Sequence, residues 1–261
     1  MQAHDLELLI DAARGAGHIA TKFTGPEAKA WDKPGGAGPV TEADLAVNAF
    51  LLDHLRSARP DYGWLSEESE DSADRLHHDT VFIVDPIDGT RSFIEGNRTW
   101  AHSIAIAHKG VITAGVVFLP MRDMMYAAAK GQGATLNDAP LVASTQNKLS
   151  QATLLSAKPN FNEKFWAKGN VPAFKMAYRP SLAYRMALVA QGRHDGMITF
   201  RPTWEWDIAA GVLIAEESGA RTSDRTGNTL IFNAKDPRTH GIIAAAPQLH
   251  TDLVTRHVAS A

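Results

Sequence analysis

The stretch Val81-Phe-Ile-Val-Asp85-Pro-Ile-Asp88-Gly-Thr90 is the part of the sequence that most clearly indicates both the fold and the candidate functional residues. The apolar run before Asp85 is typical of a short buried strand that ends on an acid. A strand end would hold the Asp85 carboxylate rigidly at the edge of a sheet. Pro86 has no backbone donor and forces a turn, which directs Asp88 back toward Asp85. We therefore predict a strand followed by a tight turn that carries two neighbouring carboxylates.

The same turn predicts an anion site. Gly89 and Thr90 can present free N–H groups at the start of a helix, an arrangement that favours phosphate. Carboxylates beside these amides would repel phosphate unless a cation lay between them. Hard divalent cations prefer oxygen ligands, and Mg²⁺ typically binds a few carboxylates together with a substrate phosphate. The pattern therefore indicates metal-assisted transfer of a phosphoryl group to water.

The overall composition excludes several other classes of protein. With 26 basic and 29 acidic residues the formal net charge is −3, so no broad basic field is available for a nucleic-acid polymer. The chain has no cysteine, which excludes disulfides, thiolate nucleophiles and cysteine-ligated metals. Residues 1–11 do not resemble a signal peptide, and no apolar run reaches membrane-spanning length. We expect a soluble, cytoplasmic protein.

Around the central strand, residues 1–150 predict two helices packed on a mostly antiparallel sheet. Apolar residues have helical spacing over residues 6–23, and a second helix begins after Thr41, a suitable N-cap. The Gly/Pro-rich residues 31–39 between them predict a mobile loop. Further strands are predicted over residues 102–107, 111–118 and 124–128.

Beyond about Ser150, strand-like and helix-like segments alternate, which favours an α/β arrangement. Strands are predicted over residues 153–157, 175–178, 195–200 and 241–246, and helices over residues 161–168, 182–191, 208–218 and 247–258. We divide the chain into an α+β part, residues 1–150, and an α/β part, residues 151–261. No flexible linker separates them, so we expect the two parts to share an interface.

Four motifs, in order along the chain, resemble the inositol monophosphatase superfamily of Mg²⁺-dependent, lithium-sensitive phosphatases. They are Pro39-Val-Thr-Glu-Ala-Asp44, Ser66-Glu-Glu68, the stretch from Asp85 to Thr90, and Trp206-Asp-Ile-Ala-Ala-Gly211. The second motif has Ser66 where the family pattern has Gly. The resemblance covers nearly the whole chain and implies a layered α-β-α-β-α sandwich with the metals between its two parts.

The resemblance also implies roles for individual residues. One Mg²⁺ would bind Glu67, Asp85 and the Ile87 carbonyl, a second would bind Asp85, Asp88 and Asp207, and a third, weaker ion would lie near Glu67. Thr90 and Glu67 would orient and deprotonate a water, and Asp44 would support Thr90 through a hydrogen bond. The amides of Gly89 and Thr90 would hold the phosphate, without a covalent phosphoenzyme. Roles for Glu68 and for Lys33 stay open.

The substrate must be recognised by residues around the leaving group, because the metal site contacts only the phosphate. Inositol-type members are similar in carrying a Glu seven residues before the last Asp, where this chain has Phe200. Its segment Phe200-Arg-Pro-Thr-Trp-Glu-Trp-Asp207 instead resembles bacterial 3′(2′),5′-bisphosphate nucleotidases. Arg185 and Tyr184 are candidates for contacting the second phosphate or the adenine, since Arg can pair bidentately with phosphate. A surface role for Arg185 is the alternative.

The leading hypothesis is removal of the 3′-phosphate of adenosine 3′,5′-bisphosphate to give AMP. A phosphatase for inositol 1-phosphate or histidinol phosphate is the nearer alternative. A regulatory or scaffold protein that keeps the fold is the remoter one. The expected partners are a small phosphorylated metabolite and, because members of the superfamily are often homodimers, a second copy of the chain.

Overall fold

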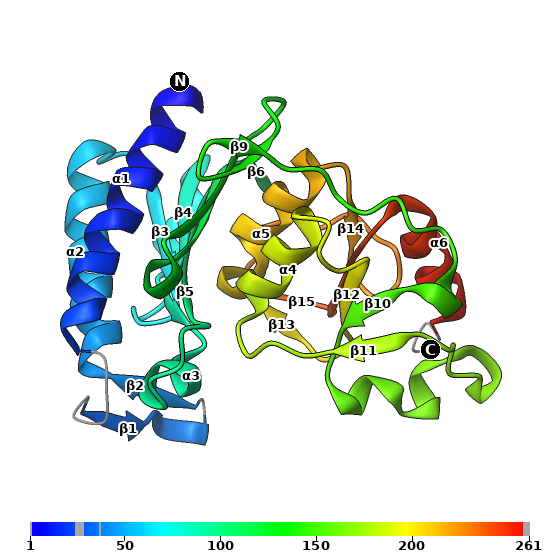
Figure 1. Ribbon diagram of the computed structural model, residues 1–261. Helices are drawn as coiled ribbons and strands as arrows, with labels where there is room; N and C mark the ends of the chain where they lie inside the picture. Colours follow the sequence, from blue (N-terminus) through cyan, green and yellow to red (C-terminus); the bar gives the residue numbers. More distant parts are fainter. Residues whose placement is uncertain (1, 24–28, 37, 258–261) are drawn as a thin grey trace.

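The computed structural model describes residues 2–23, 29–36 and 38–257. Helices and sheets alternate in layers across the molecule (Figure 1). Helices α1 (Gln2–Ala20) and α2 (Glu42–Ala58) cover one face of a large sheet, and α4 (Leu182–Ala190) and α5 (Glu205–Glu217) cover the other. A second sheet follows, and α6 (Pro247–Arg256) lies beyond it. The predicted α-β-α-β-α layering is therefore confirmed. Over the described ranges, no helix combines the length and apolar character that crossing a membrane requires.

The larger sheet has seven strands in the order β3-β4-β5-β6-β7-β8-β9. Their bounds are β3 Gly63–Ser66, β4 Thr80–Asp88, β5 Ala101–His108, β6 Val111–Leu119, β7 Met124–Ala129, β8 Ala134–Leu136 and β9 Ala139–Pro140. Only β3 and β4 are parallel neighbours, and the other pairs are antiparallel. The predicted helices on a mostly antiparallel sheet are confirmed, and so is Thr41 as the N-cap of α2.

The smaller sheet has the order β11-β10-β12-β16-β14. Its strands are β10 Thr153–Leu155, β11 Lys175–Ala177, β12 Gly196–Thr199, β14 Arg221–Ser223 and β16 Ile242–Ala245. Strand β13 (Thr203–Trp204) leads directly into α5 and pairs with β15 (Arg238–Thr239) in a short two-stranded sheet, and the five-residue helix α3 (Thr90–Ile94) follows β4. The division of the chain near Ser150 stays a prediction. One apolar core cluster contains residues from both of its sides.

Two local expectations are wrong. The predicted helix over residues 161–168 is a series of short 3₁₀ turns, Lys158–Phe161, Glu163–Phe165 and Ala167–Gly169. The side chain of Asn162 caps the second turn and Lys168 has a φ of 56°, so a continuous α-helix cannot form there. The predicted mobile loop, residues 31–39, contributes to a two-stranded hairpin of β1 (Ala30–Asp32) and β2 (Pro39–Thr41); Ala37 lies outside the described residues.

Glycines allow the middle layer to approach the larger sheet. A Cβ on Gly115 of β6 would lie 3.0 Å from the Cα of Ala210 and 3.1 Å from its carbonyl oxygen. A Cβ on Gly211 would lie 2.7 Å from the Cβ of Met186 in α4. Helix α5 is therefore held close to both the sheet and its neighbouring helix, and this closeness fixes where its first turn lies.

We expect Gly115→Ala to destabilise the protein by about 1–3 kcal/mol, the usual cost of overpacking a filled interior. The added methyl group would have to displace the backbone of α5 rather than a flexible side chain. Urea denaturation of the wild type and the variant measures the difference. An unchanged unfolding midpoint would show that α5 does not limit the space at this position.

His250 of α6 lies buried against the smaller sheet. Its Nε2 is 2.8 Å from the Ser223 hydroxyl oxygen, and its Nδ1 has no hydrogen-bond partner among the described residues. Burial, assisted by the charge of Arg221, lowers the pKa of His250 to about 4. The imidazole is therefore neutral in the folded protein, whereas in the unfolded chain it titrates near its ordinary value of about 6.5.

This difference predicts a loss of stability in acid. Between about pH 6.5 and pH 4 the unfolded chain binds a proton that folded His250 does not, so the stability that the neutral His250 ring contributes is lost as the pH falls. His250→Gln keeps an N–H donor but cannot take up the proton. We expect the stability of the wild type relative to this variant to fall by on the order of 3 kcal/mol between pH 7 and pH 4. Denaturant titrations at each pH give the free energy of unfolding of the wild type and of the variant. If the two free energies changed equally between pH 7 and pH 4, the assignment would be contradicted.

Candidate active site

A bulge in β4 brings Asp85 and Asp88 to the same side of the sheet. Residues three apart in a regular strand point to opposite faces. Here Asp85 pairs with Ser103 and Asp88 pairs with Ala101, so two residues of β4 face a single residue of β5 between these pairs. The extra residue reverses the alternation, and both carboxylates point toward the middle layer. The predicted neighbouring carboxylates are thus found, and a bulge within the strand produces them.

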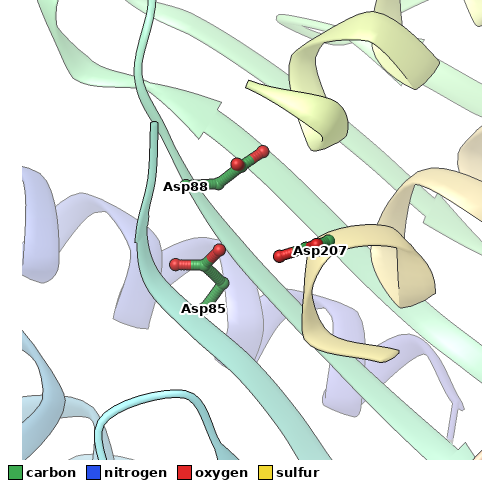
Figure 2. Close-up of side chains that lie close together, drawn as sticks. All are labelled: Asp85, Asp88 and Asp207. Carbon is green, nitrogen blue, oxygen red and sulfur yellow. The ribbon is translucent and has the colours of Figure 1, made fainter. Parts of the chain in front are cut away.

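Asp207 completes this group from the middle layer. It is the third residue of α5, whose N-cap is Trp204. Figure 2 shows its side chain directed at Asp85 and Asp88, and one oxygen from each of the three carboxylates lies within 4.8 Å of the others. Within the described part of the chain, no lysine or arginine forms an ion pair with these three groups. The fold therefore concentrates negative charge at one point, and the positive charges of Arg201 and Lys33 near Asp207 offset only part of it.

Burial makes this concentration of charge costly. Asp85 is almost fully buried, and one of its oxygens, Oδ1, has no hydrogen-bond partner among the described residues. Burial, followed by the nearby charges of Glu67 and Asp88, raises the pKa of Asp85 well above its usual range. Burial and the charges of Asp88 and Glu67 raise the pKa of Asp207 in the same direction. An all-oxygen set of this kind fits a hard divalent cation such as Mg²⁺.

Asp88 differs because the protein supplies donors to it. Its Oδ2 accepts hydrogen bonds from the Ser181 hydroxyl at 2.5 Å and from the Ala183 amide at 2.6 Å. Burial raises the pKa of Asp88 to about 6, and these two donors oppose the shift. Ser181 is also the N-cap of α4, so one contact ties the start of that helix to the end of β4.

Glu67 and Glu68 share a cation from the β1–β2 hairpin. The Nζ atom of Lys33 lies 2.8 Å from Glu67 Oε1 and 2.5 Å from Glu68 Oε1. The structure therefore brings both residues with open roles, Lys33 and Glu68, to the edge of the predicted metal site. Burial raises the pKa of Glu68 to about 7, an effect that the Lys33 contact opposes.

Asp44 and Thr90 do not form the expected hydrogen bond. Asp44 is fully buried, and its Oδ2 accepts from the amide of Thr41 at 2.8 Å in the capping box of α2. Its Oδ1 has no hydrogen-bond partner among the described residues. The Thr90 hydroxyl donates to the Ile87 carbonyl at 3.3 Å. Burial raises the pKa of Asp44 to about 6.

A cleft of about 690 Å³ contains most of the predicted site. It is lined by all the predicted metal-binding and phosphate-binding residues, namely Glu67, Asp85, Ile87, Asp88, Gly89, Thr90 and Asp207. Its lining also includes Arg91, Tyr178, Arg201 and Trp204. Asp44, Tyr184 and Arg185 are absent from its lining.

Arg185 and Tyr184 are both buried. The Nε of Arg185 donates to the carbonyl of Arg179, and its guanidinium lies 4.6 Å from the centre of the Tyr178 ring. The Tyr184 hydroxyl accepts from Arg122 at 3.4 Å. Their contact with substrate stays a prediction, and these positions do not favour it.

Two arginines that we did not predict as site residues reach the cleft. In the described structure, the side chains of Arg91 and Arg201 form no hydrogen bond or ion pair with other residues, so their charges are free to meet an anion. Arg201 follows directly after the predicted strand that ends at Phe200. The same signal, a charged residue at a strand end, had singled out Asp85.

A layered fold with converging carboxylates beside the first turn of a helix, in an open cleft, defines a hydrolase of the phosphatase class. The chain belongs to the inositol monophosphatase family, whose model matches residues 1–261. It is 34% identical over 233 residues to the Nus factor SuhB of Escherichia coli K12, with 85% of each chain covered. It is 35% identical over 209 residues to the inositol-1-monophosphatase of Rhizobium meliloti, with 74% of each covered.

Solved structures agree with this assignment. The extragenic suppressor protein suhB of Bartonella henselae has a TM-score of 0.83 at 29% identity, over 97% of each chain. An inositol monophosphatase of Thermotoga maritima has a TM-score of 0.81 at 27% identity, over 98% of this chain and 96% of the other. The predicted superfamily and fold are confirmed, and membership supports a phosphatase function. The relatives' names do not support the more specific nucleotidase prediction.

Without divalent cations, we expect Asp207→Asn to stabilise the protein. The substitution removes one charge from a buried group of acids and leaves a side chain of nearly the same shape. Thermal denaturation at pH 7.5 with EDTA should give a higher Tm for the variant than for the wild type. Adding Mg²⁺ should raise the Tm of the wild type more than that of the variant. A less stable variant in EDTA would show that the three carboxylates do not repel one another.

Proposed function

We propose that the protein is a Mg²⁺-dependent phosphomonoesterase for a small metabolite that carries a second anionic group. Adenosine 3′,5′-bisphosphate, with AMP and phosphate as products, is the first candidate substrate. The observation that carries the proposal is the cleft itself, whose lining includes three converging carboxylates and two arginines, Arg91 and Arg201, that have no side-chain partner among the described residues.

The acids of the cleft would hold the metal ions. Glu67, Asp85, Asp88, Asp207 and the carbonyl of Ile87 are the proposed ligands, for two to three Mg²⁺ ions. The unpartnered Asp85 oxygen and the raised pKa values fit this role, because a bound cation would pair with that oxygen and would offset both the burial and the mutual repulsion of the carboxylates. Bound Mg²⁺ would supply positive charge to the phosphate and increase the acidity of water.

The chain's own groups would orient the reactants. The amides of Gly89 and Thr90 begin α3, where first-turn N–H groups have no intrahelical partner and can donate to phosphate oxygens. Thr90 lines the cleft, and its hydroxyl would orient the attacking water while the Glu67 carboxylate would accept the proton of that water. Asp44 does not line the cleft, but its charge acts on Glu67 and Asp85, so it would influence the site without touching the substrate.

The wall of the cleft favours a leaving group with its own negative charge. Phe200, at the position where inositol-type members carry a Glu, is fully buried among apolar residues and cannot bind a ring hydroxyl. Next to it, Arg201 lines the cleft, and Arg91 lines it as well. Both arginines can pair with a phosphate or carboxylate of the substrate.

Inositol 1-phosphate is the second candidate substrate. The inositol-1-monophosphatase of Rhizobium meliloti is as similar to this chain as any relative described above. Its name supports a polyol phosphate, whereas the two arginines support a doubly anionic substrate.

Parallel assays of phosphate release with Mg²⁺ separate the candidates. We expect adenosine 3′,5′-bisphosphate to have a higher kcat/KM than inositol 1-phosphate or histidinol phosphate, and Asp88→Asn to remove nearly all activity. Preferential turnover of inositol 1-phosphate would establish the second candidate. No Mg²⁺-dependent release from any of the three would contradict the proposed activity.

The same assay with added Li⁺ tests the expected lithium sensitivity, and light scattering tests the expected homodimer.

We expect Arg201→Ala to raise the KM for adenosine 3′,5′-bisphosphate by about tenfold, since a charge-assisted pair contributes roughly 1.4 kcal/mol or more. Adenosine 3′-monophosphate, which lacks the second phosphate, should be affected much less. Arg256→Ala, on the exposed end of α6, is the matched control for loss of a positive charge. Equal losses on the two nucleotides would place Arg201 away from the second phosphate.

A further inference from the structure

His102 of β5 occupies the position opposite the bulge that directs the carboxylates. Asp85 pairs with Ser103 and Asp88 with Ala101, so His102 is the one residue of β5 that faces Pro86 and Ile87. Its side chain is completely buried. It packs edge to face on Trp100, with ring centres 5.5 Å apart, and lies near Phe118.

The imidazole supplies a donor to the bulge. Its Nδ1 is hydrogen-bonded to the carbonyl oxygen of Pro86. Because a carbonyl can only accept, Nδ1 carries the hydrogen, and Nε2 is left with a lone pair. A bulge disrupts the ladder of hydrogen bonds between strands, and a buried carbonyl there needs another donor. His102 provides it from the neighbouring strand.

Packing alone does not account for a histidine here. Nε2 is buried and has no hydrogen-bond partner among the described residues, so the ring carries an unsatisfied polar atom that an apolar side chain would avoid. Burial lowers the pKa of His102 to about 4, so the ring stays neutral near pH 7 and keeps one donor and one acceptor. The gain that offsets the unsatisfied atom is the hydrogen bond to Pro86.

We propose that His102 is a positioning residue: by holding the Pro86 carbonyl, it fixes the bulge and thereby the directions of the Asp85 and Asp88 carboxylates and the Ile87 carbonyl. This inference rests on the proposed function, because these three groups are the proposed ligands of Mg²⁺. Partners that orient metal ligands typically change metal affinity by 10- to 100-fold when they are lost. His102 itself touches neither metal nor substrate.

Metal binding by the whole 261-residue chain tests the proposal without relying on activity. Isothermal titration calorimetry with Mg²⁺ would compare the wild type with His102→Val, which lacks a donor, and His102→Asn, whose amide can donate near the place of Nδ1. We expect the Kd for Mg²⁺ to rise about tenfold or more in the valine variant and to stay within about threefold in the asparagine variant. Phe118→Leu is the control: it alters the packing around the ring, so it should lower the Tm and leave the Kd unchanged.

The outcomes are distinguishable. A wild type that binds no Mg²⁺ at millimolar concentrations would overturn the proposed function and, with it, the role of His102. A wild type that binds while His102→Val binds equally well would overturn only the positioning role. Should the valine variant fail to fold, the ¹⁵N chemical shifts of the His102 ring in the wild type decide: a hydrogen on Nδ1 supports the proposal, and a hydrogen on Nε2 overturns it.

Discussion

The constraint on which the rest of this structure depends is the forced proximity of three carboxylates. Asp85, Asp88 and Asp207 place oxygens within 4.8 Å of one another; the first two are buried and Asp207 is partly exposed, so water screens their charges less than at an open surface. Left alone, the folded chain would lose stability at this point. A divalent cation bound here, as proposed, would convert the same repulsion into binding energy. Instability of the empty site and affinity for the metal thus have one cause.

Two separate structural devices create this proximity. A bulge in β4 changes the alternation of one strand, so that residues an odd number apart face the same way. Gly115 and Gly211 allow α5 to lie against both the sheet and α4, which brings Asp207 to the same place from a part of the chain more than a hundred residues away. Ser181, which donates to Asp88 while capping α4, fastens the two parts together at the site.

How much the sequence predicted depended on how local each signal was. Neighbouring residues alone were enough to predict three features: the strand up to Asp85, the N-cap at Thr41 and the acid at the start of α5. The structure contains all three. The bulge needs a partner strand, so a turn was predicted in its place. The prediction of a helix over residues 161–168 was wrong, because the cap at Asn162 and the positive φ of Lys168 interrupt a segment whose sequence looks helical. Substrate contacts are the least local of all: Arg185 looked accessible on a helix, yet both faces of that helix are covered, whereas Arg201 at a strand end reaches the cleft.

The middle layer has a consequence for how this sequence can change over time. Every residue of α4, and all residues of α5 from Ile208 to Ala215, are buried, because each helix has a sheet on either side or another helix against it. The outer helices α1, α2 and α6 keep a face toward water and can accept many polar replacements there. Amino-acid substitutions should therefore accumulate mainly in the outer layers. The small residues beside Asp207 should change little, because no space is available for larger side chains. Conserved positions in that helix are then a poor guide to chemistry, since packing and the proposed metal binding constrain the same turn.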